Sequence, residues 1–172
     1  MSLNQTSDIG DLVQKKGTAV VAAIELLADI GADSASDGEA SVASETAAAL
    51  AGIAENAVKS GKDDALAAAI SAITKISQRA VDNQLQTTLI TSIGALRKVA
   101  YSAVEHSNER AARNAVDALR KFTIDSAHGG MLSPARDGIF WLGEVGTLAG
   151  KKNMPELAEL ACIGLYIAGA YG

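Results

Sequence analysis

A pair of apolar residues spaced three apart recurs every 23 residues along this chain, and no other feature restricts its fold as strongly. We call the first member of each pair an anchor. The anchors are Leu27, Leu50, Ile73, Leu96, Leu119, Leu142 and Leu165. No insertion or deletion interrupts their spacing. A fixed period of this length is typical of proteins built from one repeated structural unit.

Each anchor belongs to a stretch with the pattern of an amphipathic helix. Apolar or small residues also occur four and seven positions after the anchor, which places them on one face of an α-helix. Glycine inside a helix costs about 1 kcal/mol relative to alanine, so glycines at these positions, such as Gly31 and Gly146, indicate that neighbouring helix backbones approach closely. We therefore expect all seven anchors to be buried.

Turn-forming residues separate these stretches at the same interval. They predict seven main helices, at residues 18–34, 40–59, 63–81, 84–105, 108–127, 134–150 and 155–170. Residues 8–16 are predicted to form a short separate helix, capped by Ser7 and interrupted at Gly17. Residues 1–172 are expected to be a single α-helical repeat domain, with residues 1–17 as an N-terminal extension or short helix.

The short links between the predicted helices determine how the helices are arranged. A link of four or five residues makes each helix run back beside the one before it. Two helices then form a 46-residue hairpin, and stacking such hairpins buries the apolar face of each against the next. The sequence thus predicts an all-α fold, a right-handed α-solenoid of stacked antiparallel helical hairpins. An up-and-down bundle is the alternative, although a bundle does not require every helix to keep one register.

Two segments carry a family resemblance. Leu142–Ala149 reads Leu-Gly-Glu-Val-Gly-Thr-Leu-Ala, and Leu27–Ala32 reads Leu-Ala-Asp-Ile-Gly-Ala. With the repeat length, they resemble the units of HEAT and armadillo-type α-helical repeats, and the resemblance covers nearly the whole chain. It implies a binding role, as a non-catalytic protein-interaction scaffold or adaptor.

The charge distribution suggests where a partner would bind. The net charge of −5 argues against a general nucleic-acid binder, yet residues 73–121 carry 8 basic and only 4 acidic side chains. Alternate helices of a two-layer stack share a layer, so one surface is expected to hold the basic patch of Lys75, Arg79, Arg120 and Lys121. An ordinary solvated helix face is the simplest interpretation. The functional interpretations are an acidic protein partner or, as the alternative, phosphate-backbone binding by a DNA-repair-like HEAT-type solenoid.

Candidate residues for catalysis or metal binding are few. His106 and His128 fall in predicted turns without a cluster of metal ligands, and carboxylate pairs such as Asp63-Asp64 lie at helix starts, where they complement the helix dipole. Cys162 occupies an apolar core position and has no neighbouring base. The sequence therefore predicts no enzyme, cofactor or metal site. One cysteine cannot form an internal disulfide, which favours the cytoplasm, and no apolar run is long enough to span a membrane.

The last predicted helix is apolar on two opposite faces, although the final helix of a solenoid usually has a polar outer face. The preceding repeat can cover one face. We expect the other to form a homodimer interface through Leu160, Ile163, Tyr166, Ile167 and Tyr171. Docking onto another protein is the second possibility. Coverage by the chain's own N-terminal helix or tail is the simplest alternative.

Overall fold

The computed structural model describes residues 3–170, with side chains described from residue 17 onward. The described residues form seven α-helices and no strand, which confirms the all-α prediction. The helices are α1 (Leu3–Ser36), α2 (Ala40–Lys59), α3 (Asp63–Asp82), α4 (Gln86–Glu105), α5 (Glu109–His128), α6 (Leu132–Lys151) and α7 (Pro155–Gly169). From α2 onward, each end lies within two residues of its predicted position.

The prediction for the first helix was wrong. Instead of a short helix interrupted at Gly17, α1 is continuous from Leu3 to Ser36. A single glycine costs a helix only about 1 kcal/mol relative to alanine, and no proline accompanies Gly17 to end the helix. The predicted capping role of Ser7 falls outside the described side chains.

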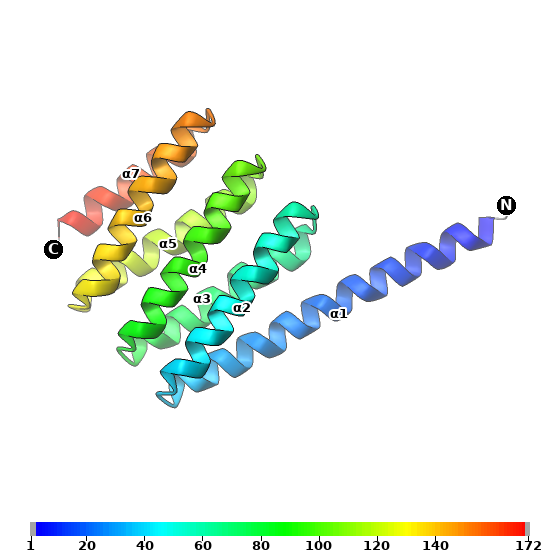
Figure 1. Ribbon diagram of the computed structural model, residues 1–172, viewed down its shortest axis with the longest axis horizontal. Coiled ribbons are helices and arrows are strands. Elements are labelled where there is room, and N and C mark those ends of the chain that lie inside the picture. Colours follow the sequence, from blue (N-terminus) through cyan, green and yellow to red (C-terminus); the bar gives the residue numbers. More distant parts are fainter. Residues whose placement is uncertain (1–2, 171–172) are drawn as a thin grey trace.

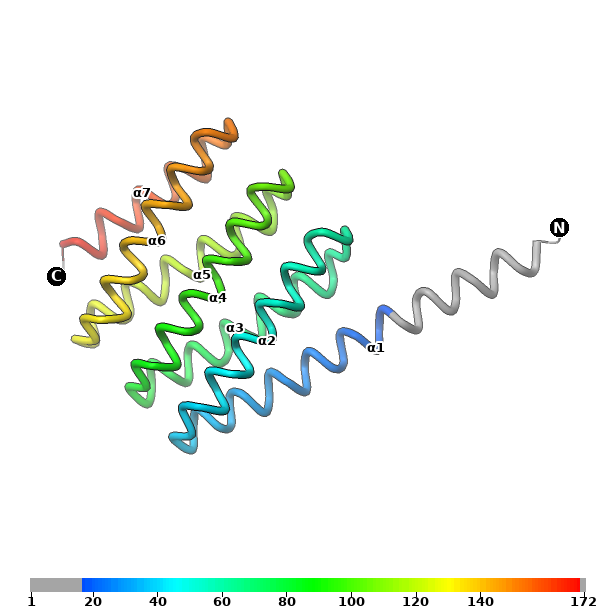
Figure 2. Tube along the Cα trace, viewed as in Figure 1, coloured from blue at the N-terminus to red at the C-terminus, as the bar shows by residue number. Residues whose placement is uncertain are grey.

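The helices form two layers that extend in one direction (Figure 1). Helices α1, α3, α5 and α7 make one layer, while α2, α4 and α6 make the other. Each helix packs against the next helix in the chain and against the next but one. The trace in Figure 2 shows the same antiparallel hairpins side by side. The molecule is thus a stack of hairpins, as the repeat predicted.

The six turns between the helices share one geometry. A residue with a left-handed φ recurs every 23 residues, at Gly38, Gly61, Gln84, Ser107, Gly130 and Asn153. The residue after it always donates its backbone N–H to the carbonyl oxygen five positions earlier, at 2.8 to 2.9 Å. This bond is the long hydrogen bond of a Schellman motif. The ends of α1 to α6 therefore share one hydrogen-bonding pattern at the same repeat position.

The anchors fill the centre of the core, with an exception at each end. The internal anchors, Leu50, Ile73, Leu96, Leu119 and Leu142, are fully buried. Leu27 and Leu165 are only half-buried, so the expectation that all seven anchors are buried was wrong for these two. Both lie in terminal helices, which have neighbouring helices along the stack on one side only.

Close packing is found at two of the predicted glycines, Gly31 and Gly146, whereas a Cβ atom added to Gly169 would meet no atom within 4 Å. A Cβ atom added to Gly31 would lie 2.5 Å from Cδ1 of Ile76, and one added to Gly146 would lie 3.1 Å from Cβ of Ala161. Both distances are shorter than ordinary van der Waals contact. These small residues therefore set the spacing between neighbouring helices.

Candidate interaction surfaces

The predicted basic patch lies on two neighbouring helices of one layer. Lys75 and Arg79 are on α3, and Arg120 and Lys121 are on α5. Their side chains are 31% to 53% exposed. The structure therefore places the four residues on the same layer, as expected, and leaves each partly accessible to a partner.

Each of these basic residues already contacts a carboxylate. The pairs are Lys75 with Asp29 at 2.6 Å, Arg79 with Asp82 at 3.9 Å, Arg120 with Asp117 at 3.2 Å and Lys121 with Asp125 at 2.6 Å. Exposed pairs of this kind contribute only about 0 to 1 kcal/mol each. An acidic partner would thus have to compete with these four carboxylates, and binding at the patch stays a prediction.

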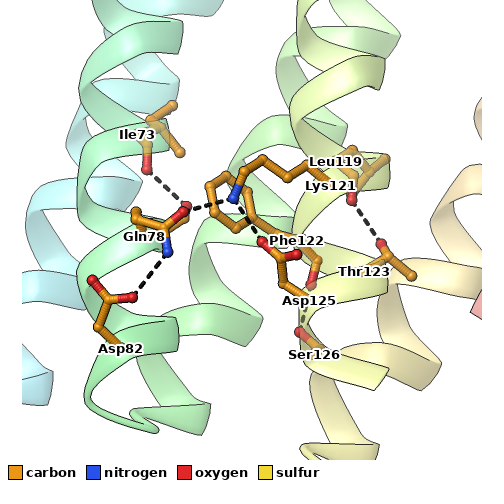
Figure 3. Close-up of polar contacts among 10 residues, drawn as sticks. Ile73, Gln78, Asp82, Leu119, Lys121, Phe122, Thr123, Asp125 and Ser126 are labelled. Atoms are coloured by element: carbon orange, nitrogen blue, oxygen red, sulfur yellow. Dashed lines mark hydrogen bonds and ion pairs between the residues drawn. The ribbon is translucent and has the colours of Figure 1, made fainter. Parts of the chain in front are cut away.

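Lys121 joins the two helices of the patch (Figure 3). Its Nζ donates to Oε1 of Gln78 on α3 at 2.6 Å and also contacts Oδ2 of Asp125. Gln78 donates in turn to Asp82 at 2.9 Å. The ammonium lies 4.5 Å from the centre of the Phe122 ring, within the range of a cation–π contact. Lys121 is therefore held by residues of α3 and α5.

Similar polar contacts link other pairs of helices in the same layer. Arg110 on α5 contacts Asp63 on α3 at 2.9 Å, and Arg113 contacts Glu156 on α7 at 3.4 Å. The residues of these pairs are 47 and 43 positions apart, close to the length of one hairpin. Along the layer, polar contacts thus add to the apolar packing between hairpins.

A cleft lies between the first turns of α5 and α7, and it was not predicted from the sequence. Its volume is about 420 Å³, and its lining includes Arg110, Arg113, Met154, Pro155 and Leu157. Only the stacking of these helices brings their first turns together. The two arginines of the cleft form the ion pairs described above. The lining of the cleft thus combines apolar side chains with two arginines that already form ion pairs.

On the opposite layer, Arg97 of α4 packs against α6. Its guanidinium lies 4.1 Å from the centre of the Trp141 ring, at cation–π distance. The neighbouring Tyr101 hydroxyl donates to Glu144 of α6 at 3.3 Å. Burial, and then the negative charge of Glu144, raise the pKa of Tyr101 above its ordinary value. The phenol therefore stays neutral at physiological pH, which suits a packing role.

Among the described residues, no group of three or more His, Cys, Asp or Glu side chains could hold a metal ion. His106 lies at the end of α4, where its ring nitrogen Nδ1 is 2.8 Å from the carbonyl oxygen of Ser102. This is the helix-end position that the sequence predicted. In the part of the chain described here, no helix is both long and apolar enough to cross a membrane.

The end of the stack exposes several large apolar side chains. Phe140 on α6 is 56% exposed, and on α7 the values are 43% for Ile163 and 82% for Tyr166. Leu160 and Ile167 are half-buried, and Tyr171 lies outside the described residues. Of the five predicted interface residues, two are thus exposed, two are half-buried and one lies outside the described residues.

Cys162 was expected in the core, and this was wrong because its side chain is exposed. It lies three residues before its anchor, a position at which Ile24, Ile70 and Val116 are buried on the other helices of the layer. Those residues are covered by the helices that follow them. The described residues contain no helix after α7, so the same position is open there.

Comparison with known proteins bears on the fold. No protein-family model matches the sequence, and the curated proteins contain no match. A solved structure described as "DHF46 filament" superposes with a TM-score of 0.53 at 13% sequence identity. The match covers 89% of this chain and 98% of the other. At this identity the similarity concerns the fold alone, and the chain is therefore similar to an all-α helical repeat.

Proposed function

We propose that residues 1–172 form one HEAT- or armadillo-like repeat domain that acts as a non-catalytic protein-interaction scaffold. The observation that carries this proposal is the exposure of two large apolar side chains, Ile163 and Tyr166, which lie three residues apart on α7 at the end of the stack. Contiguous exposed apolar surface usually marks a protein interface. The single cysteine, Cys162, suits a reducing compartment such as the cytoplasm.

The first proposed partner is a second copy of the chain, bound through the α7 face of Leu160, Ile163, Tyr166, Ile167 and Tyr171. The similarity to a chain described as a filament supports self-association. Burying apolar surface yields about 25 cal/mol per Å², against which the entropic cost of docking must be set. Self-association would cover the side chains that this structure leaves exposed.

Sedimentation equilibrium of the Ile163→Asp variant tests this proposal. The wild type should sediment above the mass of one chain, whereas the variant should be monomeric because a charge cannot be buried in an apolar contact without a large cost. Ser71→Asp is the matched control, because Ser71 is exposed and lies 92 residues before Ile163, at the same repeat position of α3. A wild-type chain that is monomeric at high micromolar concentration would refute self-association.

The second proposed partner is an acidic segment of another protein, bound at the basic patch. The support is the exposure of Lys75 and Lys121 on neighbouring helices of one layer. A glutamate-rich peptide is a suitable probe at low salt, where its charges are least screened. Replacing both lysines by Glu should weaken its binding several-fold, while Lys98→Glu, on the opposite layer, should change it little. Equal binding by all three proteins would rule out the patch.

Binding of a nucleic-acid phosphate backbone at the same patch is the alternative function. Its signature would be an affinity for duplex DNA that falls steeply and linearly with the logarithm of salt concentration. The acidic net charge of −5 favours the protein partner. A steep salt dependence with DNA, together with no binding of the acidic peptide, would reverse that preference.

A further inference from the structure

On each helix, three repeat positions face the helices that come before it in the stack. We call these the backward positions. They lie eight residues before the anchor, one before it and three after it. From α3 to α7 they are occupied by Ala65, Ala72, Ile76, Thr88, Ala95, Val99, Ala111, Ala118, Phe122, Pro134, Trp141, Val145, Leu157, Gly164 and Ala168. All are buried except Trp141, which is half-buried. These positions therefore form the backward half of each internal interface.

The first two helices carry the same apolar pattern, although no described helix precedes α1 and α1 alone precedes α2. The corresponding residues are Ala19, Leu26 and Ile30 on α1 and Val42, Ala49 and Ile53 on α2. Ile53 is half-buried and the others are exposed, with values of 62% for Leu26 and 44% for Ile30. We call these six residues the front face. Its composition matches an interface that is covered everywhere else in the stack.

The other end of the stack shows the complementary pattern. Three residues before the anchor is a forward position, and Ile24, Ala47, Ile70, Ile93 and Val116 are all buried there. At the same position Ile139 is half-buried and Cys162 is exposed. Tyr166, one residue after its anchor, extends this open surface. We call Cys162 and Tyr166 the rear face, and Figure 1 shows that the helices carrying the two faces lie at opposite ends.

We propose that the rear face of one copy binds the front face of another, so that copies stack head to tail. This inference rests on the proposed self-association and specifies its geometry. Helix α1 of the second copy would take the position of an eighth helix, packed against α6 and α7 of the first. An odd number of helices is no obstacle, because every helix keeps the same 23-residue register and packs against both the next helix and the next but one.

Head-to-tail stacking explains more of the structure than a two-fold dimer through α7. A two-fold contact would join two rear faces and leave Leu26, Ile30 and the rest of the front face exposed in both copies. A head-to-tail contact covers both kinds of face by continuing an interface already present between the hairpins. A free front face remains at one end of such an assembly and a free rear face at the other, so further copies can bind. The average number of chains in an assembly therefore increases with protein concentration.

Light scattering coupled to size-exclusion chromatography tests this geometry with one variant for each face. Leu26→Asp blocks the front face, and Cys162→Asp blocks the rear face at a position that is buried on α1 to α5. The wild-type mass should rise with concentration beyond that of two chains, and each variant alone should be monomeric. An equimolar mixture of the variants should contain dimers, since each supplies the intact face that the other lacks. Circular dichroism checks that both variants are folded, and Ser71→Asp should assemble like the wild type.

Two results would overturn the proposal in distinguishable ways. If Leu26→Asp formed a dimer by itself while Ile163→Asp stayed monomeric, the contact would be the two-fold α7 dimer. That result would support self-association and refute the head-to-tail geometry. A wild-type protein that is monomeric at every concentration tested would refute both self-association and the head-to-tail geometry.

Discussion

Replacing Gly138 by alanine tests the close packing of α6 against α5. A Cβ atom added to Gly138 would lie 2.1 Å from Oγ1 of Thr123 and 2.8 Å from its Cβ and Cγ2 atoms. Thr123 is fully buried, and its hydroxyl donates to the carbonyl oxygen of Leu119 at 2.7 Å. All three close atoms belong to one short side chain, which cannot relieve the overlap by moving a flexible end.

The expected effect combines three terms. Alanine is favoured over glycine in a helix by about 1 kcal/mol, whereas overpacking a core costs about 1 to 3 kcal/mol. Rotating Thr123 away would also leave its buried hydroxyl without an acceptor, at a cost of about 1 to 3 kcal/mol. The net prediction is that Gly138→Ala lowers the free energy of unfolding by about 1 to 5 kcal/mol.

Gly94→Ala is the matched control. Gly94 is also inside a helix, but a Cβ atom added there meets no atom within 4 Å. This variant should be stabilised by about 0.5 to 1 kcal/mol. Urea unfolding followed by circular dichroism gives both values, and adding Thr123→Ala to Gly138→Ala should recover part of the loss. A Gly138→Ala protein as stable as Gly94→Ala would refute the packing argument.

Three further variants test other parts of the structure. Leu96→Ala removes a fully buried anchor and should cost about 2 to 5 kcal/mol in urea unfolding, so an unchanged midpoint would argue against burial. Trp141→Leu keeps an apolar side chain but removes the ring beneath Arg97, and the loss should be about 0.5 to 2 kcal/mol; no loss would show that this contact is not stabilising. Glu144→Gln should lower the pKa of Tyr101 toward its ordinary value, because a negative charge beside the phenol is removed. Ultraviolet titration of the phenol measures this shift, and an unchanged or higher pKa would contradict the assigned cause.

Most of the fold could be predicted because its determinants are local and repeated. Turn residues such as Asn83 and Gly130 recur at one interval and fix the helix ends, and the anchors fix which face is buried. The errors occurred where the repeat meets an end. Leu165 and Cys162 have the residue types of core positions, and only the arrangement of neighbouring helices shows that they are incompletely covered.

The four basic residues lie in one layer as expected, but the side chains around them were not anticipated. Lys75 and Lys121 could be assigned to one layer from the repeat alone, whereas the side chains that contact them depend on rotamers across the helix interface. One signal was available. Asp29 lies 46 residues before Lys75, at the same position of the preceding hairpin, and the two side chains form an ion pair. For Gln78 and Lys121, which occupy different repeat positions, no such rule applies.

The central claim is that the 23-residue register alone determines how the helices stack, and duplicating residues 73–118 tests it most directly. This segment is one full 46-residue unit between equivalent positions of α3 and α5, so the longer chain keeps every anchor in register. In a stack, each added unit contributes its own interfaces to stability. Urea unfolding should show unchanged helicity per residue and a higher midpoint, whereas a control that duplicates only residues 75–118 should be destabilised because its register is broken. An in-register duplication that unfolds at lower urea, or a control that is equally stable, would contradict the claim.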